Sequence, residues 1–172
     1  MTIMLRYKDY RQLIDQVNAG KNINLWGKQN IGKTLTVKNC LLKDINLESV
    51  YLNLEYPFSV DHLFKVIPMS FSFYYQQDWQ NIISELSDGY NRLLVIDNFD
   101  RLHFVSNTFS HDLFRLQQLA QLENFSLLLI SRMPLEYFHF PDFANYFEKL
   151  ELNETNTWTF GQHHKIALTA EQ

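Results

Sequence analysis

The 172-residue chain has little cysteine, glycine or proline. Cys40 is its only cysteine, which excludes a disulfide within the sequence and favours a reducing compartment. Five glycines and four prolines leave little room for long flexible linkers. No apolar run approaches the roughly 20 residues that cross a bilayer, and the first ten residues lack the apolar core of a signal peptide. We therefore expect a cytoplasmic protein without membrane contacts.

An excess of positive charge is also lacking. Lys and Arg number 15 against 19 Asp and Glu, a net charge of −4, and no Lys/Arg-rich run is present. Because nucleic-acid binding depends on basic surface, the composition gives no direct evidence for it. The length suits one domain with a sizeable core. We expect that domain to span residues 1–154, followed by a polar C-terminal tail over residues 155–172.

Hydrophobic spacing predicts alternating helices and strands. Helices are predicted over residues 7–19, 35–42, 59–66, 79–86 and 113–122, and strands over residues 23–26, 50–54, 93–96, 125–130 and 147–152. The strand over residues 93–96 is a continuous apolar run, which is typical of a central parallel strand buried on both faces, and the strand over residues 125–130 is expected to be strongly buried as well. The alternation predicts an α/β fold of three layers around a mainly parallel, five-stranded sheet.

A glycine-containing segment between the first of these strands and its helix matches the pattern G-x-x-x-x-G-K-[ST] at every fixed position. Its residues are Gly27, Lys28, Gln29, Asn30, Ile31, Gly32, Lys33 and Thr34, with Leu35 directly after them. Glycine lets backbone N–H groups approach a phosphate closely, and the start of a helix attracts anions. We predict that residues 27–35 bind ATP or ADP, with Lys33 at the terminal phosphates and Thr34 on Mg²⁺.

Asp97 directly follows the apolar run 93–96, at the carboxyl end of a predicted parallel strand, where such sheets bind ligands. We predict that Asp97 completes the Mg²⁺ site with Thr34; the alternative is a carboxylate that caps the next helix. In ATPases with this type of phosphate-binding loop, a glutamate that activates the attacking water often directly follows the acid at the strand end. Asn98 stands at that position here. Because an amide orients a water without accepting its proton, we expect hydrolysis to be slow or absent.

Other polar residues at strand ends are candidates for catalysis. Asp100 either compensates for Asn98 or caps the following turn. Ser131 ends a predicted strand and is expected to hydrogen-bond a water or the γ-phosphate, so we group it with Asp97 and Asn98 as catalytic. Arg132 either reaches a phosphate or a neighbouring subunit, or forms a surface salt bridge.

Four segments resemble, in their order, the AAA+ ATPases of the DnaA group, which includes the bacterial replication initiator and its shorter regulatory homologues. They are DNFDRL at 97–102, DLFRL at 112–116, SLLLISRMP at 126–134 and FPDF at 140–143. The resemblance spans residues 22–153. It implies a P-loop NTPase base domain of the ASCE/AAA+ type that binds ATP and Mg²⁺, with a role in DNA replication.

The chain departs from the family pattern in ways that bear on function. Asn145 and Tyr146 stand where the family carries the Ser-Arg pair that senses nucleotide on the next subunit. The sequence ends soon after the last predicted strand, so no helical lid domain is expected. We therefore expect a nucleotide-dependent switch or adaptor for a protein partner, either a replication-type protein or a second copy of the chain. An active AAA+ or signal-transducing ATPase and a degenerate, non-binding module remain the alternatives.

Aromatic side chains are concentrated at residues 71–75 and Trp79. These residues either pack on the sheet or form a surface for a partner, since aromatic residues are favoured at interface hot spots. His163 and His164 are adjacent and lack the spacing of metal ligands, so no metal site is assigned to them.

Overall fold

A five-stranded parallel sheet forms the centre of the computed structural model, which describes residues 3–55, 67, 71, 78–102, 109–137 and 141–159. The strands lie in the order β3-β4-β5-β2-β6, and every neighbouring pair is parallel. Their bounds are β2 Ile23–Trp26, β3 Glu48–Asn53, β4 Arg92–Asp97, β5 Phe125–Ser131 and β6 Glu148–Glu151. The predicted α/β class and parallel five-stranded sheet are confirmed.

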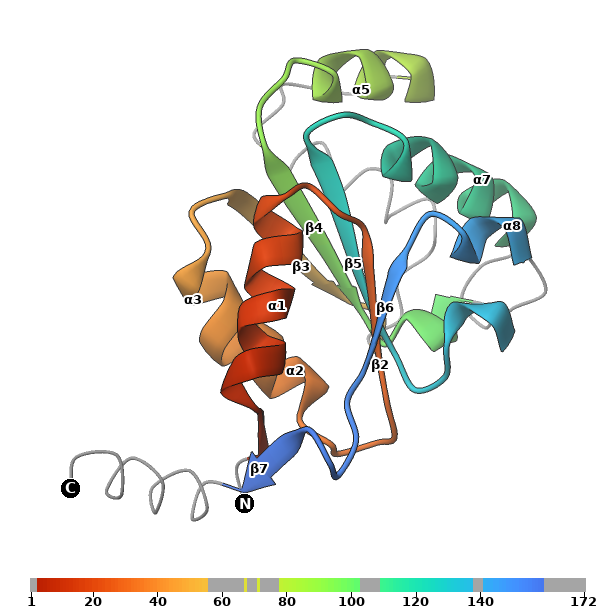
Figure 1. The fold of residues 1–172 in the computed structure, drawn as a ribbon. Coiled ribbons are helices and arrows are strands. Elements are labelled where there is room, and N and C mark those ends of the chain that lie inside the picture. The colour runs from red at the N-terminus through yellow and green to blue at the C-terminus, as the bar shows by residue number, and fades with distance from the viewer. Residues whose placement is uncertain are drawn as a thin grey trace.

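Helices cover both faces of this sheet (Figure 1). One face carries α1 (Tyr7–Asn18) and a continuous helical stretch made of α2 (Lys33–Leu35), the π-helical η1 (Thr36–Leu41) and α3 (Leu42–Asp44). The other face carries α5 (Trp79–Leu86), α7 (Phe109–Ala120) and α8 (Pro141–Ala144), with the 3₁₀ turns η2 (Phe99–Arg101) and η3 (Leu135–Tyr137). The result is the three-layer arrangement that the alternating pattern predicts.

The core lies on both faces of the sheet because successive side chains of a strand point in opposite directions. In β4, Leu93 and Val95 pack with the residues of α1, whereas Leu94 and Ile96 pack with those of α7. All four have no exposed surface. Such double burial is the reason that this strand is a continuous apolar run and not an alternating one.

Some helices and strands begin or end at residues other than the predicted ones, because the sequence pattern does not mark those ends. The strand over residues 23–26 has the predicted bounds, while α7 begins at Phe109 and not at the predicted Leu113. The predicted helix over residues 59–66 lies outside the described residues. So does most of the aromatic stretch, except that Phe71 is buried and meets Phe125 edge-on with ring centroids 5.7 Å apart.

A small antiparallel ribbon joins the two ends of the described chain. β1 (Ile3–Leu5) pairs with β7 (Thr157–Thr159), so these distant segments lie side by side (Figure 1). Three-residue strands are too short to produce a recognisable period, and the sequence did not predict this ribbon. The division of the chain at residue 154 stays a prediction.

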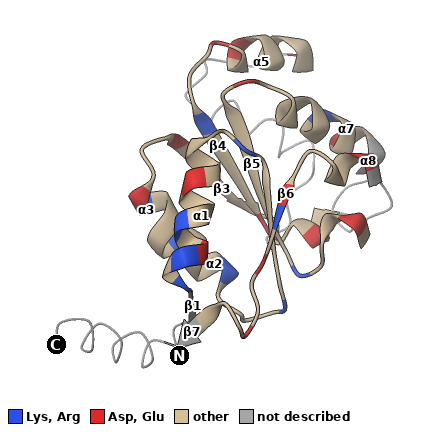
Figure 2. Cartoon of the chain, in the orientation of Figure 1, with Lys and Arg blue, Asp and Glu red and all other residues tan. Residues whose placement is uncertain are grey.

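Charged residues of both signs are interspersed along the helices α1, α2 and α3 (Figure 2). Among the described residues, no helix is long and apolar enough to span a bilayer.

A buried arginine anchors the amino end of β4. Arg92 is 5% exposed and donates from Nη1 and Nη2 to the two oxygens of Asp88 at 2.6 and 2.8 Å, and from Nε to Glu48 at 3.1 Å. The hydrogen bonds from Arg92 hold the pKa of Asp88 below its ordinary value.

Because its folded-state pKa is lowered, Asp88 contributes stability above its unfolded pKa of about 4, and this is lost as pH falls through the folded value. Asp88→Asn should therefore cost up to about 1 kcal/mol at pH 7, with the difference from wild type vanishing in strong acid. Urea unfolding of both proteins at pH 7 and pH 3 measures this. An equal difference at both pH values would show that the carboxylate charge is not responsible.

Candidate functional site

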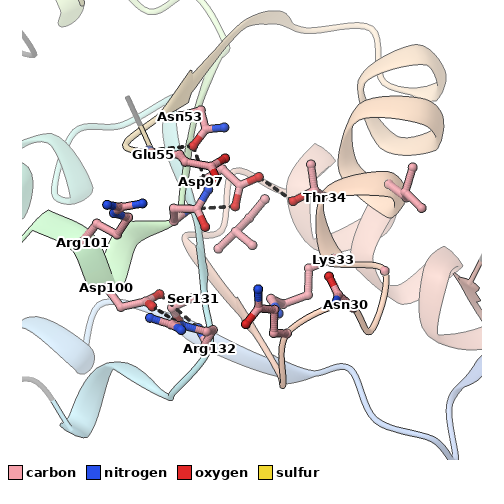
Figure 3. Close-up of a pocket in the computed structure, with 15 residues that line it drawn as sticks. Asn30, Lys33, Thr34, Asn53, Glu55, Asp97, Asp100, Arg101, Ser131 and Arg132 are labelled. Carbon is pink, nitrogen blue, oxygen red and sulfur yellow. Dashed lines mark hydrogen bonds and ion pairs between the residues drawn. The ribbon is translucent and has the colours of Figure 1, made fainter. Parts of the chain in front are cut away.

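A pocket of about 840 Å³ opens at the carboxyl edge of the sheet. It lies among residues 27–34, which we call the glycine loop, the ends of β3, β4 and β5, and the turn η2 (Figure 3). Its lining residues are Gln29, Asn30, Gly32, Lys33, Thr34, Leu35, Asn53, Glu55, Asp97, Asn98, Asp100, Arg101, Ile130, Ser131 and Arg132. Most of the residues predicted from the sequence for nucleotide, metal and catalysis are therefore brought to one place.

The glycine loop depends on both of its glycines. A Cβ on Gly27 would lie 2.4 Å from the backbone oxygen of Leu152, so only glycine fits there without a shift. Gly32 has φ of 97°, a left-handed conformation that side chains disfavour, and directly precedes α2. Lys28 forms an ion pair with Glu154 on the outside of the loop. The loop is thus packed closely against the segment that follows β6.

Lys33 is folded into the glycine loop and is 9% exposed. Its ammonium donates to the backbone oxygens of Gly27 at 2.5 Å and Lys28 at 2.7 Å. Burial lowers the pKa of Lys33, and the nearby Asp97 and Asp100 oppose that effect. The site thus has a buried cation at the start of a helix, which is an arrangement that favours a bound anion.

Thr34 and Asp97, the two residues predicted to hold Mg²⁺, are in contact in the pocket, and their role as metal ligands stays a prediction. The Thr34 hydroxyl donates to Asp97 Oδ2 at 2.6 Å, and Tyr51 donates to the same oxygen at 2.6 Å. Asp97 is 2% exposed, and its Oδ1 accepts from the backbone N–H of Asn98 at 2.7 Å. A hydroxyl beside a carboxylate offers the hard oxygen ligands that Mg²⁺ takes, with waters and phosphates completing its shell.

Tyr51 was missed by the sequence reasoning, although it lies two residues before the end of β3. Burial, followed by the hydrogen bond to Asp97 and the nearby Glu55, raises the pKa of the Tyr51 hydroxyl. The phenol therefore stays protonated and donates to Asp97. Tyr51 and the backbone N–H of Asn98 thus hold different oxygens of the Asp97 carboxylate.

Asn98 has a left-handed conformation with φ of 54° directly before η2. Its side-chain Nδ2 donates to Asn53 Oδ1 at 2.7 Å. Asn53 was also missed, yet it is the register partner of Asp97 in the adjacent strand. The signal available in the sequence was its place at a strand's carboxyl end, where parallel sheets carry their functional side chains.

Ser131 is 1% exposed and is the last residue of β5. Its hydroxyl donates to the backbone oxygen of Met133 at 2.6 Å and accepts from Asn24 Nδ2 at 3.0 Å. Asn24 Oδ1 in turn accepts from the backbone N–H of Leu135 at 3.2 Å. Because a hydroxyl has a single proton, Ser131 has only acceptor capacity left for a ligand in this arrangement. Its catalytic role stays a prediction.

Asp100 and Arg132 form an ion pair at the rim of the pocket, with Nε and Oδ2 2.8 Å apart. Both readings of Arg132 from the sequence are compatible with this position, since it is in a salt bridge and also lines the pocket. Among the described residues, no group of three or more His, Cys, Asp or Glu gathers as a metal-binding cluster. A Mg²⁺ ion here would therefore depend on Thr34, Asp97 and phosphate oxygens.

Comparison with known proteins identifies the fold. No family model matches the sequence, and neither does any curated protein. Among solved structures, the Orc1 protein of Aeropyrum pernix in complex with DNA has a TM-score of 0.64 at 19% identity, covering 96% of this chain and 49% of that one. A chain from Drosophila ORC bound to DNA has a TM-score of 0.65 at 18% identity, covering 92% and 44%. A chain from Drosophila ORC bound to AT-rich DNA and Cdc6 has 0.61 at 14%, covering 91% and 58%.

The chain therefore has the α/β fold of AAA+ initiator base domains, with its five sheet strands in the order 2-3-4-1-5 counted along the sequence. It spans about half the length of the solved chains that it matches. At these identities the likeness establishes the fold. The resemblance to the DnaA group rests on the sequence segments alone.

Proposed function

We propose that the protein binds MgATP or MgADP at the glycine loop and acts as a nucleotide-dependent switch or adaptor for a protein partner in DNA replication or its regulation. One observation carries this proposal. The Lys33 ammonium lies inside the glycine loop, beside the 2.6 Å contact between Thr34 Oγ1 and Asp97 Oδ2. This arrangement supports an anion site next to a divalent-cation site, as a nucleotide with Mg²⁺ requires.

The chain's own groups have distinct roles in this proposal. Backbone N–H groups of residues 27–35 surround the phosphates, and Lys33 moves from the loop carbonyls to the terminal phosphates. Thr34 and Asp97 hold Mg²⁺, which neutralises phosphate charge when it is bound. Asn98, held by Asn53, orients a water without taking its proton, so turnover is slow and the bound nucleotide defines a lasting state.

The partner is inferred from the matched structures. One is an Orc1 protein in complex with DNA, one is Drosophila ORC bound to DNA, and one is Drosophila ORC bound to AT-rich DNA and Cdc6. They support a protein partner in replication for this chain, either a replication-type protein or a second copy.

Amide hydrogen exchange tests the switch. Wild-type protein would be compared alone, with MgADP and with a MgATP analogue whose β–γ bond resists hydrolysis. We expect residues 27–35 to be protected by both nucleotides and a second segment to differ between them. Protection at the loop with identical exchange everywhere else would mean that the nucleotide is bound but switches nothing.

An active ATPase is the second candidate function, and Glu55 favours it. This residue lies two positions after Asn53, the last residue of β3, and lines the pocket (Figure 3). Among the described residues, nothing donates a hydrogen bond to its carboxylate, whereas Asp97 and Asp100 are both engaged. Glu55 is therefore a carboxylate that can take the proton of an attacking water, which the amide of Asn98 cannot do.

If Glu55 is this general base, Glu55→Gln should lower phosphate release by about 100-fold or more while the Kd for MgATP stays within about twofold. Phosphate release and equilibrium nucleotide binding would be measured on the same preparations. Glu151→Gln, an exposed residue of β6 outside the pocket, makes the same charge change and should leave turnover intact. Equal turnover in wild type and Glu55→Gln would exclude this role.

A further inference from the structure

Arg132 is held in a fixed orientation at the rim of the pocket. Its backbone N–H donates to Asp100 Oδ1 at 3.1 Å, and its side-chain Nε donates to Asp100 Oδ2 at 2.8 Å. The side chain of Asp100 is only 15% exposed, so the carboxylate is itself constrained. Asp100 therefore fixes Arg132 both at the backbone and at the inner nitrogen of its guanidinium.

The outer nitrogens of Arg132 are left available. A guanidinium has five N–H donors, and only the Nε donor is directed at Asp100. Within the described residues, neither Nη nitrogen donates a hydrogen bond to the protein. The side chain is 57% exposed and lines the pocket (Figure 3). Two parallel N–H groups in this geometry match the oxygens of a phosphate.

The topology of the sheet places Arg132 near the terminal phosphate. It follows β5, which lies between β2, whose loop carries Lys33, and β4, which ends at Asp97. The end of β5 thus lies between the lysine and the Mg²⁺ ligand. Arg132 is also close enough that its charge contributes to lowering the pKa of Lys33, after the larger effect of burial. The positive charges of Lys33 and Arg132 repel each other, and an anion bound between them in the pocket would offset that repulsion.

We propose that Arg132, oriented by Asp100, binds the γ-phosphate and makes the pocket selective for a nucleoside triphosphate over a diphosphate. This inference rests on the proposed nucleotide binding and adds the residue that distinguishes the two states of the switch. In the DnaA group, the arginine of a Ser-Arg pair senses nucleotide on the next subunit, and Asn145 and Tyr146 stand at that position here. Arg132 would instead sense the nucleotide bound in its own subunit. Asp100 is then a positioning residue and not a substitute for a catalytic glutamate.

The test is the ratio of two affinities in the full chain. Arg132→Gln should raise the Kd for a MgATP analogue with a non-hydrolysable β–γ bond by about ten- to a hundredfold, because a charge-assisted contact is lost. The Kd for MgADP should change less than about twofold, since a diphosphate lacks the group that Arg132 contacts. Isothermal titration of both nucleotides gives the ratio without any need for turnover.

Two further variants separate orientation from charge. Asp100→Asn keeps the shape but weakens the bond to Nε, so it should reduce the triphosphate preference less than Arg132→Gln and leave MgADP affinity unchanged. Arg101→Gln removes another arginine that lines the same pocket, and it should leave the ratio of the two affinities as in wild type. Thermal melting of each variant without nucleotide checks that it is folded.

Specific results would overturn the inference. If Arg132→Gln weakens both nucleotides equally, or weakens neither, Arg132 does not read the γ-phosphate. If Arg101→Gln changes the ratio as strongly as Arg132→Gln does, the effect is one of general charge. If wild type binds neither nucleotide, the proposed function fails first and this inference fails with it.

Discussion

Lys33→Ala should abolish the thermal stabilisation that MgATP and MgADP give to the protein. A ligand at 100 times its Kd stabilises the folded state by about 2.7 kcal/mol. For a domain of this size, that raises the melting temperature by about 5–10 °C. The variant lacks the buried ammonium that donates to the loop carbonyls at 2.5 and 2.7 Å, so its shift should be close to zero at the same nucleotide concentration.

Lys28→Ala is the matched control for this prediction. It removes a lysine of the same loop whose ammonium lies outside the pocket and pairs with Glu154. This variant should keep most of the nucleotide-dependent shift. Melting curves of wild type and both variants, recorded with and without millimolar nucleotide, make the comparison. A full shift in Lys33→Ala would mean that nucleotide binds elsewhere or that the glycine loop does not need its lysine.

Gly27→Ala should both destabilise the fold and weaken nucleotide binding. The added Cβ would lie 2.4 Å from the backbone oxygen of Leu152 and 3.2 Å from the side chain of Ile31. The first contact is with backbone, which has no rotamer to move, so the loop and the end of β6 must separate. We expect a loss of about 1–3 kcal/mol in the free energy of unfolding. Because the glycine loop is displaced, the nucleotide-dependent shift should fall as well.

Gly20→Ala separates this close contact from ordinary backbone strain. Gly20 has φ of 74°, but no atom lies within 4 Å of the position that a Cβ would take. Its substitution should cost only the strain of a left-handed residue, about 1–2 kcal/mol, and should leave the nucleotide response intact. Urea unfolding and nucleotide titration of both variants measure the two effects. A normal nucleotide response in Gly27→Ala would show that the close packing of the loop on residue 152 is not needed for binding.

The sheet could be predicted from the sequence because its strands leave strong local signals. The apolar runs in β4 and β5 are continuous, and β2 is followed directly by the glycine loop. The ribbon of β1 and β7 could not be predicted, since its pairing joins residues near opposite ends of the chain. Long-range pairing of short strands leaves no period in the sequence.

Some residues of the candidate site could likewise be predicted from the sequence, and others could not. The glycine loop and Asp97 were recognisable because their spacing and their place after a strand are local features. Tyr51, Asn53 and Glu55 were missed because their importance comes from the strand register that sets Asn53 beside Asp97. Nor could the sequence specify the pairing of Asp100, which depends on two turns that meet only in the folded protein.

The direct test of the central claim is calorimetric titration of wild-type protein with MgADP and with a slowly hydrolysed MgATP analogue. The proposed function predicts saturable binding of one nucleotide per chain, lost in Lys33→Ala and retained in Lys28→Ala. Titrations without binding heat at two temperatures, together with unchanged melting temperatures at millimolar nucleotide, would contradict it. The fold would then be a nucleotide-binding architecture used without its nucleotide.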